Sequence, residues 1–248
     1  MNASANRIHN ALQAVALLHQ RQSGDPALAG SIRAIKRFQA RRFTATYSDL
    51  LHNARYKAAA HFFLHELYSD KDYGERDQQF ARIANTIAKL FPQSVVNTAA
   101  ALAEVHSLTE SLDDQMARQW LGCEEETALV DECARYVYCW RRVGDAAARH
   151  QQLDVVLLLG DELDRLTRMP GLRTLLRMMR GPASAAELSS LQGFLESGFD
   201  AFANMRGATD FLATLRLRET VLIGALWNDE LVECETKMRN LLAADDAF

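Results

Sequence analysis

The chain has 248 residues, of which 48% are hydrophobic and 24% are charged, and its formal net charge is −4. This composition is typical of an ordinary folded protein and argues against a disordered chain. The sequence has neither a run of about 18 uncharged apolar residues nor a basic, apolar leader, so we expect no membrane span and no secretory signal.

Apolar residues recur with helical spacing through long intervals that lack proline, and no segment alternates as a strand would. We therefore expect helices near residues 3–22, 27–50, 54–69, 75–91, 94–106, 108–121, 125–143, 145–168, 171–180, 185–206, 208–228 and 229–243. The segments Ser107–Glu110 and Ser184–Glu187 fit capping boxes that begin helices, and Gly144 suits a helix end.

These elements predict an all-α fold, a single irregular multi-helix bundle of about ten to twelve helices. No Pro/Gly/Ser-rich linker divides the chain, so residues 1–248 are expected to form one domain, with a weak possible subdivision near 122–126. The four cysteines are too few and too irregularly spaced for a disulfide scaffold. Reduced thiols, and hence a cytoplasmic location, are expected.

Charge is distributed unevenly along the chain. Residues 1–60 carry nine Lys/Arg against two acidic residues, whereas residues 104–132 carry nine Asp/Glu against Arg118 alone. Such a split indicates two segments that attract each other within the fold, a surface for a protein partner, or a nucleic-acid surface. Attraction within the chain is the simplest interpretation.

A basic stripe is formed by Arg33, Arg37 and Arg41, which repeat every four residues and therefore share one helix face. The opposite face carries Ile32, Ile35, Phe43 and Leu50, so the three arginines are expected to point outward. Guanidinium groups in such a row can bind phosphates or an acidic partner. The alternative is a solvated face, or one covered by the acidic segment 104–132.

The segment 62–83 joins an aromatic helix end to a charged turn. We expect Phe63, Leu67 and Tyr68 to pack in the core. Asp70 or Asp72 is a natural cap for the following helix. Arg76 and Asp77 could anchor the turn as a buried ion pair or present a recognition surface, and anchoring is the more common use.

Metal and catalytic motifs are absent from the sequence. His61 and His65 share a helix face, but there is no HExxH and no repeated ExxH pair, so we expect no metal site and no cofactor. Nucleotide-binding and nucleophile motifs are also missing, so no catalytic residue is assigned and the balance leans against an enzyme. The apolar stripe from Met169 to Met179 is rich in methionine, which can bind partners adaptably but more often fills cores.

The segment 62–83 resembles a family of proteobacterial proteins of unknown function, whose members share an FFLxxLY pattern followed by D-aromatic-xxRD. The similarity continues at Leu90-Phe91-Pro92, Leu108-Thr109-Glu110 with Leu112-Asp113, Pro182-Ala183, Leu191 to Glu196, Gly198-Phe199, Phe211-Leu212 and Arg218-Glu219. Ser69-Asp70 stand where the family has a Gly-Pro-like turn. The resemblance implies a single bacterial, cytoplasmic, helical unit and transfers no catalytic residue.

Taken together, these patterns favour a non-enzymatic helical binding or regulatory protein that acts through a surface for a protein partner. The candidate binding residues are Arg33, Arg37, Arg41, Asp72, Arg76 and Asp77. A helical protein that binds a small molecule or a haem- or metal-type cofactor, with or without catalysis, is the alternative. A nucleic-acid-associated protein that uses the basic stripe comes third. The sequence gives no indication of oligomeric state.

Overall fold

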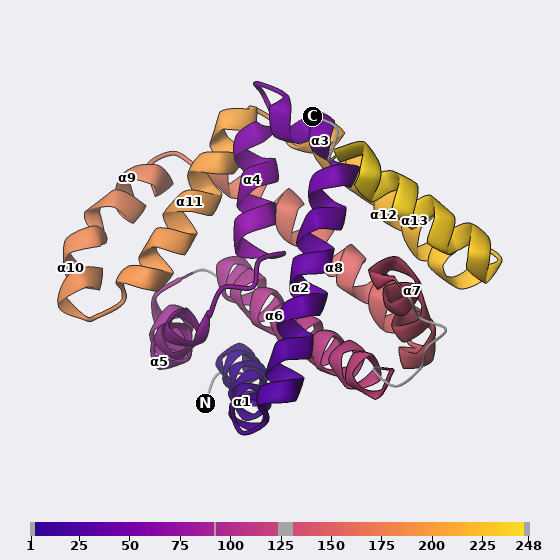
Figure 1. The fold of residues 1–248 in the computed structure, drawn as a ribbon. Coiled ribbons are helices and arrows are strands. Elements are labelled where there is room, and N and C mark those ends of the chain that lie inside the picture. The colour runs from indigo at the N-terminus through magenta and orange to yellow at the C-terminus, as the bar shows by residue number, and fades with distance from the viewer. Residues whose placement is uncertain (1–2, 92, 124–130, 246–248) are drawn as a thin grey trace.

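The computed structural model describes residues 3–91, 93–123 and 131–245, and this part of the chain is helical without a strand (Figure 1). The predicted all-α fold, an irregular multi-helix bundle, is therefore confirmed for the described residues. The helices are α1 (Ala3–Ser23), α2 (Pro26–Thr46), α3 (Ser48–His52), α4 (Lys57–Glu66), α5 (Gly74–Leu90), α6 (Gln93–Gly122), α7 (Glu132–Val143), α8 (Ala146–Thr167), α9 (Leu172–Met178), α10 (Arg180–Ala185), α11 (Ser189–Met205), α12 (Thr209–Asn228) and α13 (Leu231–Asp245).

The 30-residue helix α6 is the hub of the bundle. It packs against α1, α2, α5, α7 and α8. Figure 1 shows α2 and α4 side by side in front, with α9 to α11 on one flank and α7, α12 and α13 on the other. Among the helices of the described ranges, none combines the length and the apolar composition that crossing a membrane requires.

Two predicted helices, 94–106 and 108–121, are one continuous helix. The proposed capping box at Ser107–Glu110 is therefore wrong. The Thr109 hydroxyl donates to the Val105 carbonyl oxygen at 2.8 Å inside the helix, and Glu110 is buried among partners from α1 and α2. These side chains have partners that do not require a helix end, so the main-chain ladder continues.

The second proposed capping box, Ser184–Glu187, ends a helix instead of beginning one. Glu187 has the left-handed φ of 55°, its N–H donates to the Ser184 carbonyl, and the Leu188 N–H donates to the Ala183 carbonyl. This pattern is the Schellman motif of a helix C-terminus. Gly144 does cap the end of α7 with φ of 72°, as predicted.

The long helix predicted over 27–50 is interrupted at Tyr47, where α2 ends and α3 follows. The predicted 171–180 helix is likewise divided, with Met179 between α9 and α10. The proposed subdivision near 122–126 falls mostly on residues 124–130, which lie outside the described residues, as do Pro92 and the start of the predicted 125–143 helix.

Three apolar clusters form the core. The first joins α2, α6, α7, α12 and α13, the second joins α2, α3, α4, α8, α11 and α12, and the third joins α1, α5, α6 and α11. Phe63 is buried in the second cluster, and Leu67 and Tyr68 pack half-buried against it, as predicted. The three clusters meet around a cavity. Its wall includes one residue from each cluster: Trp140 from the first, Phe43 from the second and Leu12 from the third.

Candidate functional site

A cavity of about 130 Å³, the polar cavity, lies where the three clusters meet. Its wall is unusually charged for the interior of a protein. The cationic side chains that line it are Lys36, Arg42, Arg76 and Arg149, and the carboxylates are Glu66, Asp77, Glu110, Asp113 and Glu219. They come from α2, α4, α5, α6, α8 and α12, so the cavity exists only when these helices pack together.

One side of the polar cavity is built on the interruption between α2 and α3. Arg42 donates to Glu219 Oε1 on α12 at 2.5 Å, and the Tyr47 hydroxyl donates to the same oxygen at 2.8 Å. Burial opposes the charged form of Arg42, but Glu219 outweighs it and holds the pKa of Arg42 above its ordinary value. Burial and the neighbouring Glu219 charge both raise the pKa of Tyr47, which stays a neutral donor.

A second ionic group centres on Glu110 of α6. Its carboxylate accepts from Lys36 Nζ at 2.6 Å and lies 3.2 Å from His19 Nε2. Burial works against the charged carboxylate, but His19 and Lys36 dominate and hold the pKa of Glu110 at about 2. One turn further, Asp113 accepts from Gln39 at 3.0 Å, and burial raises the pKa of Asp113 because an amide compensates its charge poorly.

A third group joins the start of α5 to α6. Asp77 lies 2.7 Å from His106 Nε2 and accepts from Arg76 at 3.2 Å. The Arg76 guanidinium carbon lies 4.1 Å from the ring centre of Tyr73 and 4.8 Å from that of Phe194. Burial opposes the Asp77 charge, but the hydrogen bond from His106 lowers the pKa of Asp77. The predicted pairing of Arg76 with a carboxylate is confirmed.

Arg149 of α8 differs from the other cations in the wall. Lys36, Arg42 and Arg76 each have a carboxylate partner, whereas no described carboxylate forms a salt bridge with Arg149. Arg149 is 6% exposed, donates to Gln152 at 3.4 Å, and stacks on Trp140 with its guanidinium carbon 4.1 Å from the ring centre. A buried cation without a carboxylate is uncommon.

Unpaired donors gather in the wall of the polar cavity. Within the described ranges, Arg42 Nε, Trp140 Nε1 and Arg149 Nη2 are buried and have no hydrogen-bond partner. All three are N–H donors, and all three side chains line the cavity. Leaving a buried donor unpaired typically costs about 1–3 kcal/mol, so these three donors are costly as they stand.

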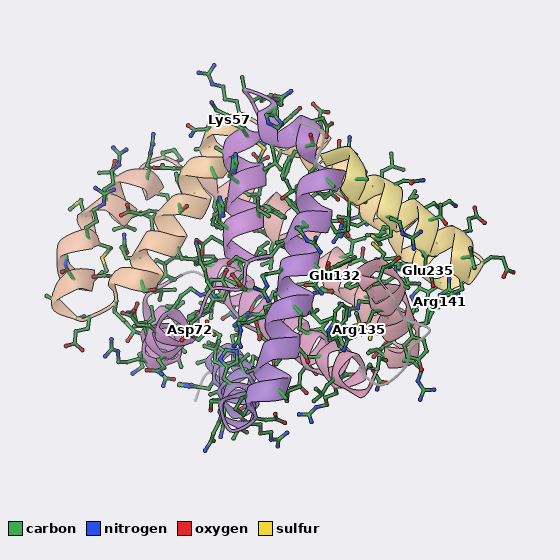
Figure 2. The ribbon with its side chains drawn as sticks, viewed as in Figure 1. Lys57, Asp72, Glu132, Arg135, Arg141 and Glu235 are labelled. Carbon is green, nitrogen blue, oxygen red and sulfur yellow. The ribbon has the colours of Figure 1, made fainter. Side chains whose placement is uncertain are left out.

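The candidate residues from the sequence divide between this cavity and the surface. Arg76 and Asp77 line the cavity. Asp72 lies exposed at the beginning of α5 (Figure 2), where its carboxylate accepts from the Gly74 N–H at 2.8 Å. It therefore shapes a turn and does not line the cavity, and the predicted helix cap is wrong because Tyr73, which makes no side-chain cap bond, holds the N-cap position of α5.

The basic stripe is exposed, as predicted for Arg33, Arg37 and Arg41. Arg41 pairs with Glu132, the first residue of α7 and the last of the acidic segment 104–132. This segment also contacts residues 1–60 where Glu104 pairs with Arg7 and Glu110 with Lys36. These contacts favour the interpretation that the charge asymmetry acts within the fold.

His61 and His65 lie exposed on α4 with ring centres 5.7 Å apart. In the part of the chain that the structure describes, no group of three or more His, Cys, Asp or Glu residues is placed to hold a metal ion.

Sequence reasoning missed the distant members of the cavity wall. Arg149 and Trp140 carry no local signature, because an arginine beside alanines is typical of a solvated helix. Glu110, Asp113 and Glu219 stand in segments on which the expected family resemblance was based, and that resemblance alone drew attention to them.

Residues 18–231 match the family model of a domain of unknown function, DUF8198. The matched range contains every residue of the polar cavity wall except Leu12. No curated protein and no solved structure matches the chain.

Proposed function

The chain belongs to the DUF8198 family, a domain of unknown function. From the polar cavity we propose that it is a helical binding protein for a small anionic molecule. The observation that carries the proposal is the set of unpaired N–H donors on Arg42, Trp140 and Arg149 around one buried space. All three side chains belong to the wall of the same cavity, and guanidinium groups are suited to binding the oxygens of a carboxylate or phosphate group.

The charge of Arg149 supports an anion over a neutral ligand, even though the wall as a whole holds five carboxylates and four cationic side chains. Arg149 interacts with the Asp113 carboxylate but forms no salt bridge with a described residue, so an anionic ligand would give it a direct partner. Size limits the bound group. The cavity of about 130 Å³ is close to the roughly 150 Å³ cavity that admits benzene in an engineered protein. A single acidic head group fits this space.

Binding without catalysis is the simpler form of the proposal. The described hydroxyl side chains of the cavity wall, apart from the tyrosines, are those of Ser69 and Thr109, and both donate to main-chain carbonyls, at 2.9 and 2.8 Å. A nucleophilic role would require a base to accept from the hydroxyl instead. We therefore give the Asp77–His106 pair a structural role: it holds α5 against α6 and contributes polar groups to the cavity wall.

The test compares Arg149→Gln with Arg142→Gln, an exposed arginine on α7 that serves as the matched control. Thermal unfolding of the full chain is followed at increasing concentrations of phosphate and of propanoate at constant ionic strength. A ligand at 100 times its Kd stabilises by about 2.7 kcal/mol, which raises the Tm of the wild type and of Arg142→Gln. Arg149→Gln should lose this increase. An equal increase in all three proteins, or none in the wild type, would overturn the proposal.

The surface for a protein partner that the sequence predicts on α2 stays a prediction. Arg33 and Arg37 are exposed and available for such a contact. The unpaired donors of the polar cavity place the small-molecule proposal ahead of it.

A further inference from the structure

A second cavity of about 390 Å³, the apolar chamber, lies beside the polar cavity among α4, α5, α6, α8, α9, α10 and α11. Its wall is made of aromatic and aliphatic side chains, with Thr86, Thr98 and Gln192 as the polar exceptions, and no described charged residue lines it. Its volume falls within the range of about 300–1,000 Å³ typical of ligand pockets.

The two spaces share a wall. Phe63, Leu67, Phe80, Val105, Leu191 and Phe194 line both of them. The charged space and the apolar one are therefore adjacent and are bordered by the same side chains. Phe194 marks the junction, because the Arg76 guanidinium lies 4.8 Å from its ring centre on the polar side.

The apolar chamber is partly open to solvent, because Phe91, Leu195 and Met179 in its wall are 36%, 39% and 41% exposed. Interiors pack as densely as organic crystals, and each cavity forfeits the dispersion contacts of the side chains around it. A chain of methylene groups would restore those contacts. Each buried methylene group is worth up to roughly a fourfold gain in affinity.

The arm formed by α9 and α10 is the wall of the chamber that is least firmly held. Leu172, Leu176 and Met179 face the chamber, whereas Met178 is 70% exposed, and α9 has no buried residue. Figure 1 shows the arm at the outer edge of the bundle, away from α6. Of the methionines in the stripe predicted from the sequence, Met179 lines the chamber, where its flexible side chain can adapt to a bound chain, whereas Met169 and Met178 are exposed.

The arm is joined to α11 by surface ion pairs. Arg180 pairs with Glu196 at 2.5 Å and Arg173 pairs with Asp200 at 2.8 Å, with both arginine side chains about half exposed or more. Exposed pairs of this kind contribute little to stability. These ion pairs therefore add little to holding the arm, which Gln192 of α11 also binds by donating to the Leu176 carbonyl oxygen at 2.6 Å.

We propose that the ligand is an amphiphile whose acidic head group occupies the polar cavity and whose unbranched aliphatic chain occupies the apolar chamber. This inference rests on the proposed function, since it assigns the same polar cavity to the head group. It adds the chemical class of the ligand, a medium-chain carboxylate or alkyl phosphate.

The test measures how affinity depends on chain length. Calorimetric titrations of the full chain use propanoate, octanoate, dodecanoate and dodecyl phosphate below their micelle concentrations. We expect affinity to rise by about threefold to fourfold per added methylene until the chamber is filled. Dodecyltrimethylammonium, with the same chain and a cationic head, should bind at least about a hundredfold more weakly than dodecanoate, as unpaired buried charges require.

A matched pair of variants locates the chain. Ala99→Leu adds volume to the apolar chamber and leaves the polar cavity wall unchanged, whereas Ala213→Leu adds the same volume at an exposed position of α12. Ala99→Leu should weaken dodecanoate binding at least about tenfold by removing space for several methylenes, with propanoate binding unchanged. Ala213→Leu should bind both like the wild type. If Ala99→Leu does not fold, the chain-length series on the wild type decides alone.

The outcomes separate the two proposals. Arg149-dependent binding of propanoate or phosphate without a gain from longer chains would overturn the amphiphile and keep the anion site. Absence of any Arg149-dependent binding would overturn both. Equal affinity for dodecanoate and dodecyltrimethylammonium would also refute the amphiphile, because the chain would then bind without the acidic head.

Discussion

Glu110 offers the sharpest test of the buried ionic network, through the single substitution Glu110→Gln. The side chain is 4% exposed and bridges Lys36 of α2 and His19 of α1. Glutamine keeps the shape and an acceptor oxygen but removes the charge. The Lys36 ammonium, which is 13% exposed, then lies in the interior without its anion.

The size of the expected stability loss follows from the pKa of the Glu110 carboxyl. A glutamate whose pKa is 4.5 in the unfolded chain and about 2 in the fold contributes about 3 kcal/mol of stability when it is ionised. Because the folded pKa is the lower one, this contribution is present above pH 4.5 and is lost as the pH falls from 4.5 towards 2. His19 acts in the opposite sense: its hydrogen bond to Glu110 raises its pKa, so its contribution is complete below pH 6.5 and declines as the pH rises.

Both contributions are present together between about pH 5 and 6, where the stability gap between wild type and variant should be widest. Urea unfolding of both proteins, followed by circular dichroism at pH 5.5 and pH 4, should give a gap of about 3 kcal/mol that narrows by roughly 0.8 kcal/mol at pH 4. Glu104→Gln is the control, because its pair with Arg7 is nearly half exposed and should contribute under about 1 kcal/mol. A gap below about 1 kcal/mol for Glu110→Gln, or one that does not change between the two pH values, would refute the reasoning.

Three further predictions concern other parts of the molecule. Phe63→Ala should lower the unfolding free energy by about 3–5 kcal/mol, because the ring is 3% exposed, and an unchanged urea midpoint would contradict its place in the core. The double reversal Arg37→Glu with Arg41→Glu should change stability by less than about 1 kcal/mol, because the stripe is exposed. If the stripe serves a partner, the reversal should also abolish a salt-sensitive pull-down contact, and retention of every partner would remove the stripe from the candidates. Cys133 and Cys234 should react slowly with a disulfide reagent at pH 8, because burial raises the pKa of both thiols, and rapid labelling of the native protein would refute this.

Local patterns were sufficient for the parts of the fold that depend on neighbours in sequence. Helical periodicity identified the all-α class, the spacing of Phe63 with its neighbours identified a buried face, and the dipeptide Arg76-Asp77 was recognised as a candidate ion pair. Each of these features involves residues within about one or two helical turns of one another.

The same local rules failed where a distant partner decides the outcome. The Ser107–Glu110 pattern satisfies a capping box, but Lys36 binds Glu110 from 74 positions away and the helix continues. Arg42 and Glu219 are separated by 177 positions, so nothing near either residue predicts their pair. The polar cavity could not be derived from the sequence because its wall is assembled almost entirely from such long-range pairs.

Helix α1 bears on how fragments of this protein should be designed. The family match begins at residue 18, inside this helix, yet Ile8 and Leu12 pack in the third cluster and Arg7 pairs with Glu104. A fragment cut at residue 18 would expose one flank of α6 to water, and each core side chain lost forfeits about 1.5–3 kcal/mol. Such a fragment would expose a contiguous apolar surface along α6 and tend to aggregate during expression. Deletion series and fusion proteins should therefore retain the chain from Ala3 onward. The start of the family match falls inside α1, a helix that covers one flank of α6.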